Sequence, residues 1–84
     1  MAEEKVGTVI KYFSKINVAA IRLDGSLGVG DTIHIQGHTT DYTQEVGSMQ
    51  IENRNVESAG PGADIGIMVQ DRVREHDTVY KVTD

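Results

Sequence analysis

The chain has 84 residues, a length that allows one domain. It contains no cysteine and no tryptophan, which excludes a disulfide framework and thiolate metal ligands and leaves an aliphatic core. The formal net charge is −5 and the charges are scattered, so a broad basic surface for nucleic acid is excluded.

The apolar runs and the start of the chain indicate its compartment. No apolar run approaches the roughly 18 residues that a membrane span needs. The acidic start, Met1 to Gly7, lacks the apolar core of a secretory signal. We therefore expect a soluble, cytoplasmic protein with no membrane partner.

Apolar residues recur with a period of two, which is typical of β-strands. Over residues 6–13 the alternation places Val6 and Ile10 on one face of a strand. Val9 and Phe13 lie on the other face. Glycine, asparagine, aspartate and proline separate the strands, and no segment has a convincing helical period. The expected strands are residues 6–13, 16–23, 32–37, 42–51, 65–70 and 77–82.

Short strands with this punctuation predict an all-β protein. Closure of the sheet into a barrel would remove its exposed edges. We expect a small closed antiparallel β-barrel of about six strands, a number within the usual range for sheets. The expected barrel covers residues 6–83, and residues 1–5 are expected to form an N-terminal tail.

A glycine-rich corner lies between the second and third expected strands. Leu27 and Val29 are two residues apart, a spacing that lets both side chains point into the barrel. Asp31 can accept hydrogen bonds from nearby backbone amides, and glycine permits positive φ. We expect a structural role without chemistry for the corner residues, which are Gly25, Leu27, Gly28, Val29, Gly30 and Asp31.

The order of several short motifs resembles the second-domain β-barrel of translational GTPases such as elongation factor Tu. The motifs run from “GTV” through “LGVGDTIHI”, “QEVGSM”, “AGPG” and “IGI” to “DTVYKV”, and they span residues 6–82. The resemblance implies a stand-alone, translation-associated module in protein biosynthesis. Such a module would contact tRNA or rRNA, or a protein partner in translation, through loops and strand ends.

The resemblance also points to the segment Gln50–Asn55, because the corresponding segment of elongation factor Tu helps to form the pocket for the aminoacyl end of tRNA. It implies Gln50, Asn53 and Arg54 as the candidate RNA-binding residues. Arg54 is the one cation of this segment, and its planar guanidinium suits a phosphate. The alternative is that these are solvated loop residues.

No pattern in the sequence marks a catalytic centre. The chain has no G-x-x-x-x-G-K-[ST] loop, so no nucleotide cofactor is expected, and no serine lies in a nucleophile-elbow pattern. His34, His38 and Asp41 offer nitrogen and oxygen ligands, but they lie on a strand and a turn, where histidines four residues apart do not converge. We expect no metal, no other cofactor and no enzymatic activity.

Two further functions stay open. The acidic surface also suits a protein-interaction module that docks onto a GTPase, a ribosomal protein or a larger enzyme. Barrels similar to the expected one occur at the ends of larger enzymes, including some collagenase-type peptidases. On that interpretation the chain is an accessory domain.

Overall fold

The computed structural model describes residues 2–83, which form strands and turns but no helix. All paired strands are antiparallel, so the all-β prediction is confirmed. No helix long and apolar enough to cross a membrane is found in this range. The ten strands are β1 (Ala2–Phe13), β2 (Val18–Leu23), β3 (Leu27–Gly28), β4 (Thr32–Gln36), β5 (Asp41–Glu45), β6 (Met49–Ile51), β7 (Arg54–Val56), β8 (Ser58–Ala59), β9 (Asp64–Met68) and β10 (Thr78–Thr83).

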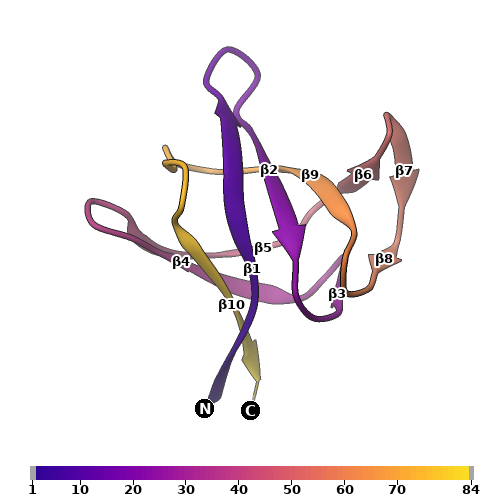
Figure 1. The fold of residues 1–84 in the computed structure, drawn as a ribbon, viewed down its shortest axis with the longest axis horizontal. Helices are drawn as coiled ribbons and strands as arrows, with labels where there is room; N and C mark the ends of the chain where they lie inside the picture. The colour runs from indigo at the N-terminus through magenta and orange to yellow at the C-terminus, as the bar shows by residue number, and fades with distance from the viewer. Residues whose placement is uncertain (1, 84) are drawn as a thin grey trace.

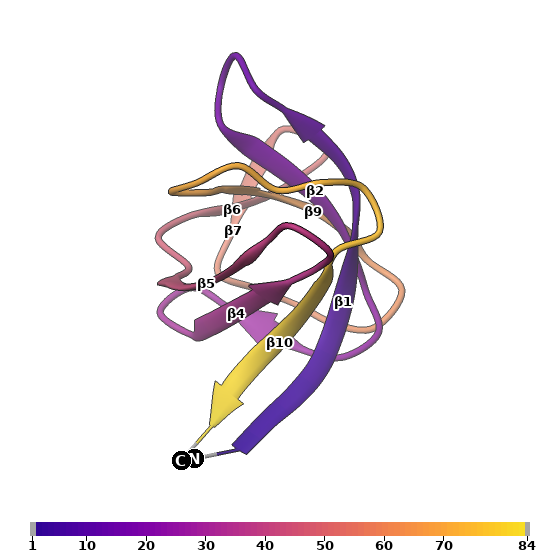
Figure 2. The ribbon, with the colours of Figure 1, turned by 90° about the vertical axis from the view of Figure 1, so that its left-hand side faces the viewer.

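Eight strands form one sheet in the order β5-β4-β10-β1-β2-β9-β6-β7, and β3 pairs with β8 in a second, two-stranded sheet. The larger sheet curls around the core, with β1 and β2 forming a long hairpin (Figure 1). Ala2 and Thr83, the first and last described residues, pair with each other at the opposite end of the molecule from the turn of this hairpin (Figures 1 and 2).

A closed six-stranded barrel is not confirmed, because β5 and β7 are the two ends of the larger sheet and do not pair with each other. Side chains of β5 tie its edge to the chain at the end of β9. The Gln44 amide donates to the carbonyl of Met68 at 3.0 Å and accepts from the backbone N–H of Gln70 at 2.8 Å. The Tyr42 hydroxyl donates to the carbonyl of Asp71 at 3.1 Å. Side-chain hydrogen bonds thus take the place of a strand ladder at this edge.

Two irregularities in β1 decide which of its side chains are buried. The register against β10 shifts around Val6, and the register against β2 shifts around Ile10. Each shift interrupts the period of two, as a bulged residue does. Val6 and Val9 are therefore both buried, whereas Ile10 and Phe13 are exposed. The strict alternation expected over residues 6–13 is wrong for this reason.

The core is aliphatic apart from one methionine, as the composition predicts. Its members come from both sheets and from the connections between strands, and Tyr12 and Tyr42 pack against it from the side. The buried core residues are Val6, Val9, Ala19, Ile21, Leu23, Leu27, Ile33, Ile35, Val46, Met49, Ile65, Ile67, Val69, Val73 and Val79.

The expected corner lies in the connection from β2 to β4. Gly28 donates its backbone N–H to Asp31 Oδ2 at 2.8 Å, which is the local bond expected for an aspartate at a turn. Leu27 is buried, but Val29 is 44% exposed because the chain turns directly after the two residues of β3. The expectation that Val29 also points inward is therefore wrong. Gly30 is the one glycine of the corner with a positive φ, 95°.

The segment expected as a tail begins a strand instead. Ala2 pairs with Thr83 and Lys5 pairs with Tyr80, so residues 2–5 form the first part of β1 against β10. The reason is that the last strand of the chain supplies a backbone partner for each of these residues. Met1 of the expected tail lies outside the described residues.

Candidate functional site

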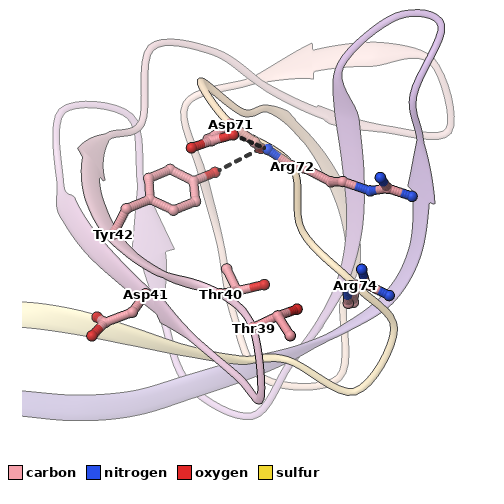
Figure 3. Close-up of a pocket in the computed structure, with 7 residues that line it drawn as sticks. All are labelled: Thr39, Thr40, Asp41, Tyr42, Asp71, Arg72 and Arg74. Carbon is pink, nitrogen blue, oxygen red and sulfur yellow. Dashed lines mark hydrogen bonds between the residues drawn. The ribbon is translucent and has the colours of Figure 1, made fainter.

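A polar hollow of about 260 Å³ lies between the β4–β5 turn and the chain that follows β9 (Figure 3). Its lining residues are Thr39, Thr40, Asp41, Tyr42, Asp71, Arg72 and Arg74. The Tyr42 hydroxyl reaches the Asp71 carbonyl, and Asp71 Oδ1 accepts the backbone N–H of Arg72 at 2.7 Å. Burial raises the pKa of Tyr42, so its hydroxyl stays protonated and able to donate.

The polar hollow holds carboxylate, guanidinium and hydroxyl groups in one lining. Its two carboxylates and two guanidinium groups balance in charge. Figure 3 shows the Arg72 side chain directed away from Tyr42 and Asp71. No side-chain hydrogen bond within residues 2–83 joins a hydroxyl of the hollow to a general base. The hydrogen bond from Tyr42 to the Asp71 carbonyl joins the β5 edge to the chain after β9.

His34 lies between two carboxylates beside the polar hollow. Its Nδ1 is 3.0 Å from Glu3 Oε2 and its Nε2 is 2.5 Å from Asp41 Oδ1. The hydrogen bond with Asp41, followed by that with Glu3, raises the pKa of His34 above its ordinary value. His34 thus joins β1, β4 and β5 through its two ring nitrogens.

The sequence offered His34, His38 and Asp41 as possible metal ligands. The structure brings His34 and Asp41 into contact but does not add His38 to them. His38 is exposed in the turn after β4, as the strand-then-turn interpretation predicts. Both ring nitrogens of His34 already contact carboxylates on opposite sides of the ring. Within residues 2–83, no group of three or more histidine, aspartate or glutamate side chains has the geometry to hold a metal ion.

A second concave surface, which we call the hairpin groove, crosses the outer face of β2, β9 and β6. Its volume is about 360 Å³. Phe13 and Ile16, from the end of β1 and the β1–β2 turn, form an apolar wall and are 40% and 60% exposed. The lining residues of the hairpin groove are Phe13, Ile16, Val18, Ala20, Gln50, Glu52, Asn53, Asp64, Ile65 and Gly66.

Small residues form the floor of the hairpin groove. Ala20 pairs with Gly66, and Gly66 pairs with Gln50, so the three lie side by side across β2, β9 and β6. The core-facing neighbours of Ala20 and Gly66 are buried residues of the same strands, which leaves these two positions on the outer face. Because neither Ala20 nor Gly66 has a large side chain, the surface is concave between the apolar wall and the residues of β6 and the β6–β7 turn.

Two of the three predicted RNA-contacting residues lie in the hairpin groove. Gln50 and Asn53 form its polar wall, and Gln50 Nε2 donates to Asn55 Oδ1 at 3.0 Å. Glu52 and Asn53 make the two-residue turn between β6 and β7 with φ of 51° and 66°. Arg54 directly follows Asn53 in the chain and is exposed, but it is not among the lining residues of the groove. The groove therefore contains Gln50 and Asn53 without Arg54.

Sequence reasoning missed the apolar wall of the groove. Period-two alternation treated Phe13 and Ile16 as ordinary strand residues. The available signal was the position of Ile16 directly after the polar pair Ser14 and Lys15, where an isoleucine lies in a turn. Met68, which pairs with Val18 and is 60% exposed, extends the apolar surface beside the groove.

The chain is similar to parts of larger proteases. It is 43% identical over 77 residues to an uncharacterized protease of Methanocaldococcus jannaschii, covering 90% of this chain and 19% of that protein. It is 41% identical over 78 residues to a collagenase of Porphyromonas gingivalis, covering 90% of this chain and 22% of that protein. The chain thus spans about a fifth of the length of these curated relatives. No protein-family model matches it.

The fold is that of a solved domain. The C-terminal domain of a putative U32 peptidase of Geobacillus thermoleovorans matches with a TM-score of 0.90 and 18% identity, covering 95% of this chain and 93% of that one. The selenomethionine variant of that domain matches with a TM-score of 0.86 and 18% identity, covering 90% of this chain and 96% of that one.

These similarities correct the family that the sequence motifs suggested. The relatives are named as a protease and a collagenase, and the matching structure is a peptidase domain, so the assignment to the elongation factor Tu barrel is wrong. The expected translation-associated RNA-binding function is wrong for the same reason. The alternative of an accessory domain of a larger enzyme fits the findings better.

Proposed function

We propose that this chain is the C-terminal accessory domain of a U32-type peptidase, and that it binds polypeptide while another part of the protein carries the catalytic centre. One observation carries the proposal. The chain aligns over 90% of its length with proteases that are about five times longer, and its fold matches a whole C-terminal peptidase domain.

The two concave surfaces support a binding role. The polar hollow offers no nucleophile with a base, which argues that the domain does not cleave peptide bonds by itself. The hairpin groove offers exposed apolar side chains beside amide groups, and such a mixture is suited to a polypeptide. By this proposal the domain raises the local concentration of a long substrate near the catalytic part.

The proposal is tested in the Porphyromonas gingivalis collagenase. Three forms are compared: the intact enzyme, the enzyme without the 78-residue segment that aligns with this chain, and the enzyme with this chain in place of that segment. Cleavage is measured on gelatin and on a short peptide that spans only the catalytic centre. We expect deletion to raise KM for gelatin and to leave cleavage of the short peptide unchanged, and we expect this chain to restore the gelatin KM.

Two results would overturn the proposal. One is that the deleted enzyme cleaves gelatin with the KM of the intact enzyme, which would leave the domain without a role in polypeptide binding. The other is that the isolated 84-residue chain hydrolyses the short peptide, which would make the domain catalytic.

A further inference from the structure

We propose that the hairpin groove binds an extended, uncharged, proline-rich segment of polypeptide in the polyproline II conformation. The inference rests on the proposed function and names the kind of polypeptide that its binding surface would take.

Much of the backbone beneath the hairpin groove is paired within the sheet. β2 pairs with β1 on one side and with β9 on the other, and β9 pairs in turn with β6. The groove lies across the face of these strands, and Ala20, Gly66 and Gln50 on its floor are already paired with one another, so this floor offers a bound segment few main-chain partners. The occupant would therefore be held mainly by side chains. A polyproline II segment meets that condition, because it has no internal hydrogen bonds and presents its carbonyl groups outward.

The two walls of the groove match the two kinds of group on such a segment. Phe13 and Ile16 offer an exposed ring and an aliphatic side chain against which pyrrolidine rings can pack. The Lys11 ammonium lies over the Phe13 ring, 5.2 Å from its centre, so it covers part of one face of that ring. Across the floor, Gln50 and Asn53 carry amide groups. Gln50 donates one amide hydrogen to Asn55 and retains a second for a carbonyl of the occupant.

The charge of the groove favours an uncharged occupant. Of its two carboxylates, Asp64 is bound by Arg22, with Arg22 Nε 2.9 Å from Asp64 Oδ1. That hydrogen bond holds the pKa of Asp64 below its ordinary value, so the pair stays ionised and internally neutralised. Glu52 is the remaining carboxylate, and it lies at the tip of the β6–β7 turn, on the rim of the groove. This carboxylate would repel an anionic segment. A strongly cationic segment would find only this one carboxylate, because the other carboxylate of the lining, Asp64, is already bound by Arg22.

The position of the groove leaves it open to a substrate. Ala2 and Thr83 pair with each other at one end of the molecule, whereas the β1–β2 turn projects at the other end (Figures 1 and 2). In a protein that continues beyond either residue, the rest of the chain joins at the end opposite this turn. Phe13, at the end of β1, and Ile16, in the turn, therefore lie at the end of the molecule opposite the point of attachment, which favours a polypeptide from outside over the neighbouring catalytic part.

The test is a titration of the isotope-labelled 84-residue chain with a blocked oligoproline peptide, followed by amide chemical shifts. A flexible glycine–serine peptide of the same length is the control ligand. We expect oligoproline to shift the amides of the hairpin groove and to leave those of the polar hollow unchanged. The glycine–serine peptide should cause no shifts.

Three variants locate the binding. Phe13→Ser removes the aromatic wall, and Gly66→Leu fills the floor from a position where an added Cβ meets its nearest neighbour, Val18 Cγ1, at an ordinary 3.5 Å. Each should weaken oligoproline binding about tenfold, the scale expected for a central apolar contact. Val29→Ser is the matched control, because Val29 is equally exposed but lies outside the groove. It should bind as the parent chain does.

Three results would overturn the inference, provided that the spectra show a folded chain. They are the absence of shifts at millimolar oligoproline, shifts centred on the polar hollow or on the β5 edge, and equal weakening by Val29→Ser. The proposed function is judged separately by gelatin cleavage in the chimeric collagenase. If this chain restores gelatin cleavage but does not bind oligoproline, the accessory role stands and the polyproline II occupant is rejected.

Discussion

In the polar hollow, Tyr42 and Asp71 are held by hydrogen bonds, whereas in the hairpin groove apolar side chains are left partly exposed. Tyr42 and Asp71 hold the edge of β5 through these hydrogen bonds. Phe13 and Ile16 in the groove are 40% and 60% exposed and do not belong to the buried core. The difference is that hydrogen bonds of the hollow join separate segments of the fold, whereas the apolar wall of the groove lies outside the buried core.

Buried polar side chains occur on the side of the molecule that carries the polar hollow, which we call the hollow side: β5, the turn before it and the chain between β9 and β10. The three buried polar residues, Thr40, Gln44 and Asp77, lie in β5, in the turn that leads to it or in the chain before β10. Within residues 2–83, no buried side-chain nitrogen or oxygen lacks a hydrogen-bond partner. Substitutions on the hollow side should therefore cost stability, and substitutions in the groove should affect binding at little cost to stability.

The largest difference is expected between two glycines, one on each side. A Cβ at Gly37 would coincide with the carboxylate of Asp77, which is buried and accepts the backbone N–H of Arg74 at 2.9 Å. Gly37→Ala should lower the free energy of unfolding by about 2–3 kcal/mol, because Asp77 must move and lose that bond. Gly66→Ala, where the added Cβ has ordinary contacts, should change it by less than about 0.5 kcal/mol. Urea unfolding of both variants provides the measurement, and equal losses would contradict the division.

Two glutamines provide the next comparison. Gln44 is buried and bonds to the backbone of Met68 and Gln70, so Gln44→Ala should destabilise the chain by about 2 kcal/mol by leaving these backbone groups without partners. Gln50 is exposed, and Gln50→Ala should leave the unfolding midpoint nearly unchanged. Hydrogen exchange adds a local measurement. Faster exchange of the Gln70 amide is expected in the Gln44 variant, and unchanged exchange there would contradict the assigned bond.

His34 adds a pH dependence to the hollow side. Glu3 of β1 and Asp41 of β5 contact its ring, and the ring of Tyr80 of β10 lies 6.0 Å from it between centroids. Because the pKa of His34 is raised in the folded chain, the stabilisation is fully present below the ordinary histidine pKa of about 6.5. It is lost as the pH rises through the folded-state pKa.

Thermal unfolding across this pH range should therefore show a decline in stability that His34→Gln removes. His38→Gln is the control, because His38 is exposed in the neighbouring turn and contacts neither carboxylate. A decline that persists in the His34 variant would show that another group is responsible.

The smallest effect is expected on the groove side, in the turn between β6 and β7. Glu52 and Asn53 both have positive φ, and a two-residue hairpin turn of this kind favours Asn-Gly. The double substitution Glu52→Asn and Asn53→Gly should raise the free energy of unfolding by about 0.5–1 kcal/mol by removing backbone strain. Chemical unfolding checks the gain. A loss of stability would show that the side chain of Glu52 or Asn53 contributes more than its backbone conformation costs.

The all-β fold could be predicted from sequence because alternation in β2 and β4 matches burial there. Ala19 and Ile21 are buried, as are Ile33 and Ile35. Prediction failed in β1 because two register shifts interrupt the alternation. It also failed in β7 and β8, where most side chains are exposed and no apolar pattern marks the strands.

The β5 edge and the two concave surfaces were harder to predict, because they depend on contacts between distant segments. The bonds of Gln44 join residues 24 and 26 positions apart, and no local pattern indicates them. The motif order led to the wrong family for a related reason. Residues such as Leu27 and Asp31 satisfy the packing and hydrogen bonding of a corner, so they report local geometry, while function depends on the site that a fold carries.

The pairing of Ala2 with Thr83 has a mechanical consequence. Because β1 and β10 are antiparallel neighbours and both free ends lie at the same end of their ladder, tension applied between the termini loads the hydrogen bonds one pair after another. The strands would then open like a zipper at low force, starting from Ala2 and Thr83. The same closeness of the ends allows the whole domain to be inserted into a surface loop of a host protein without stretching either connection.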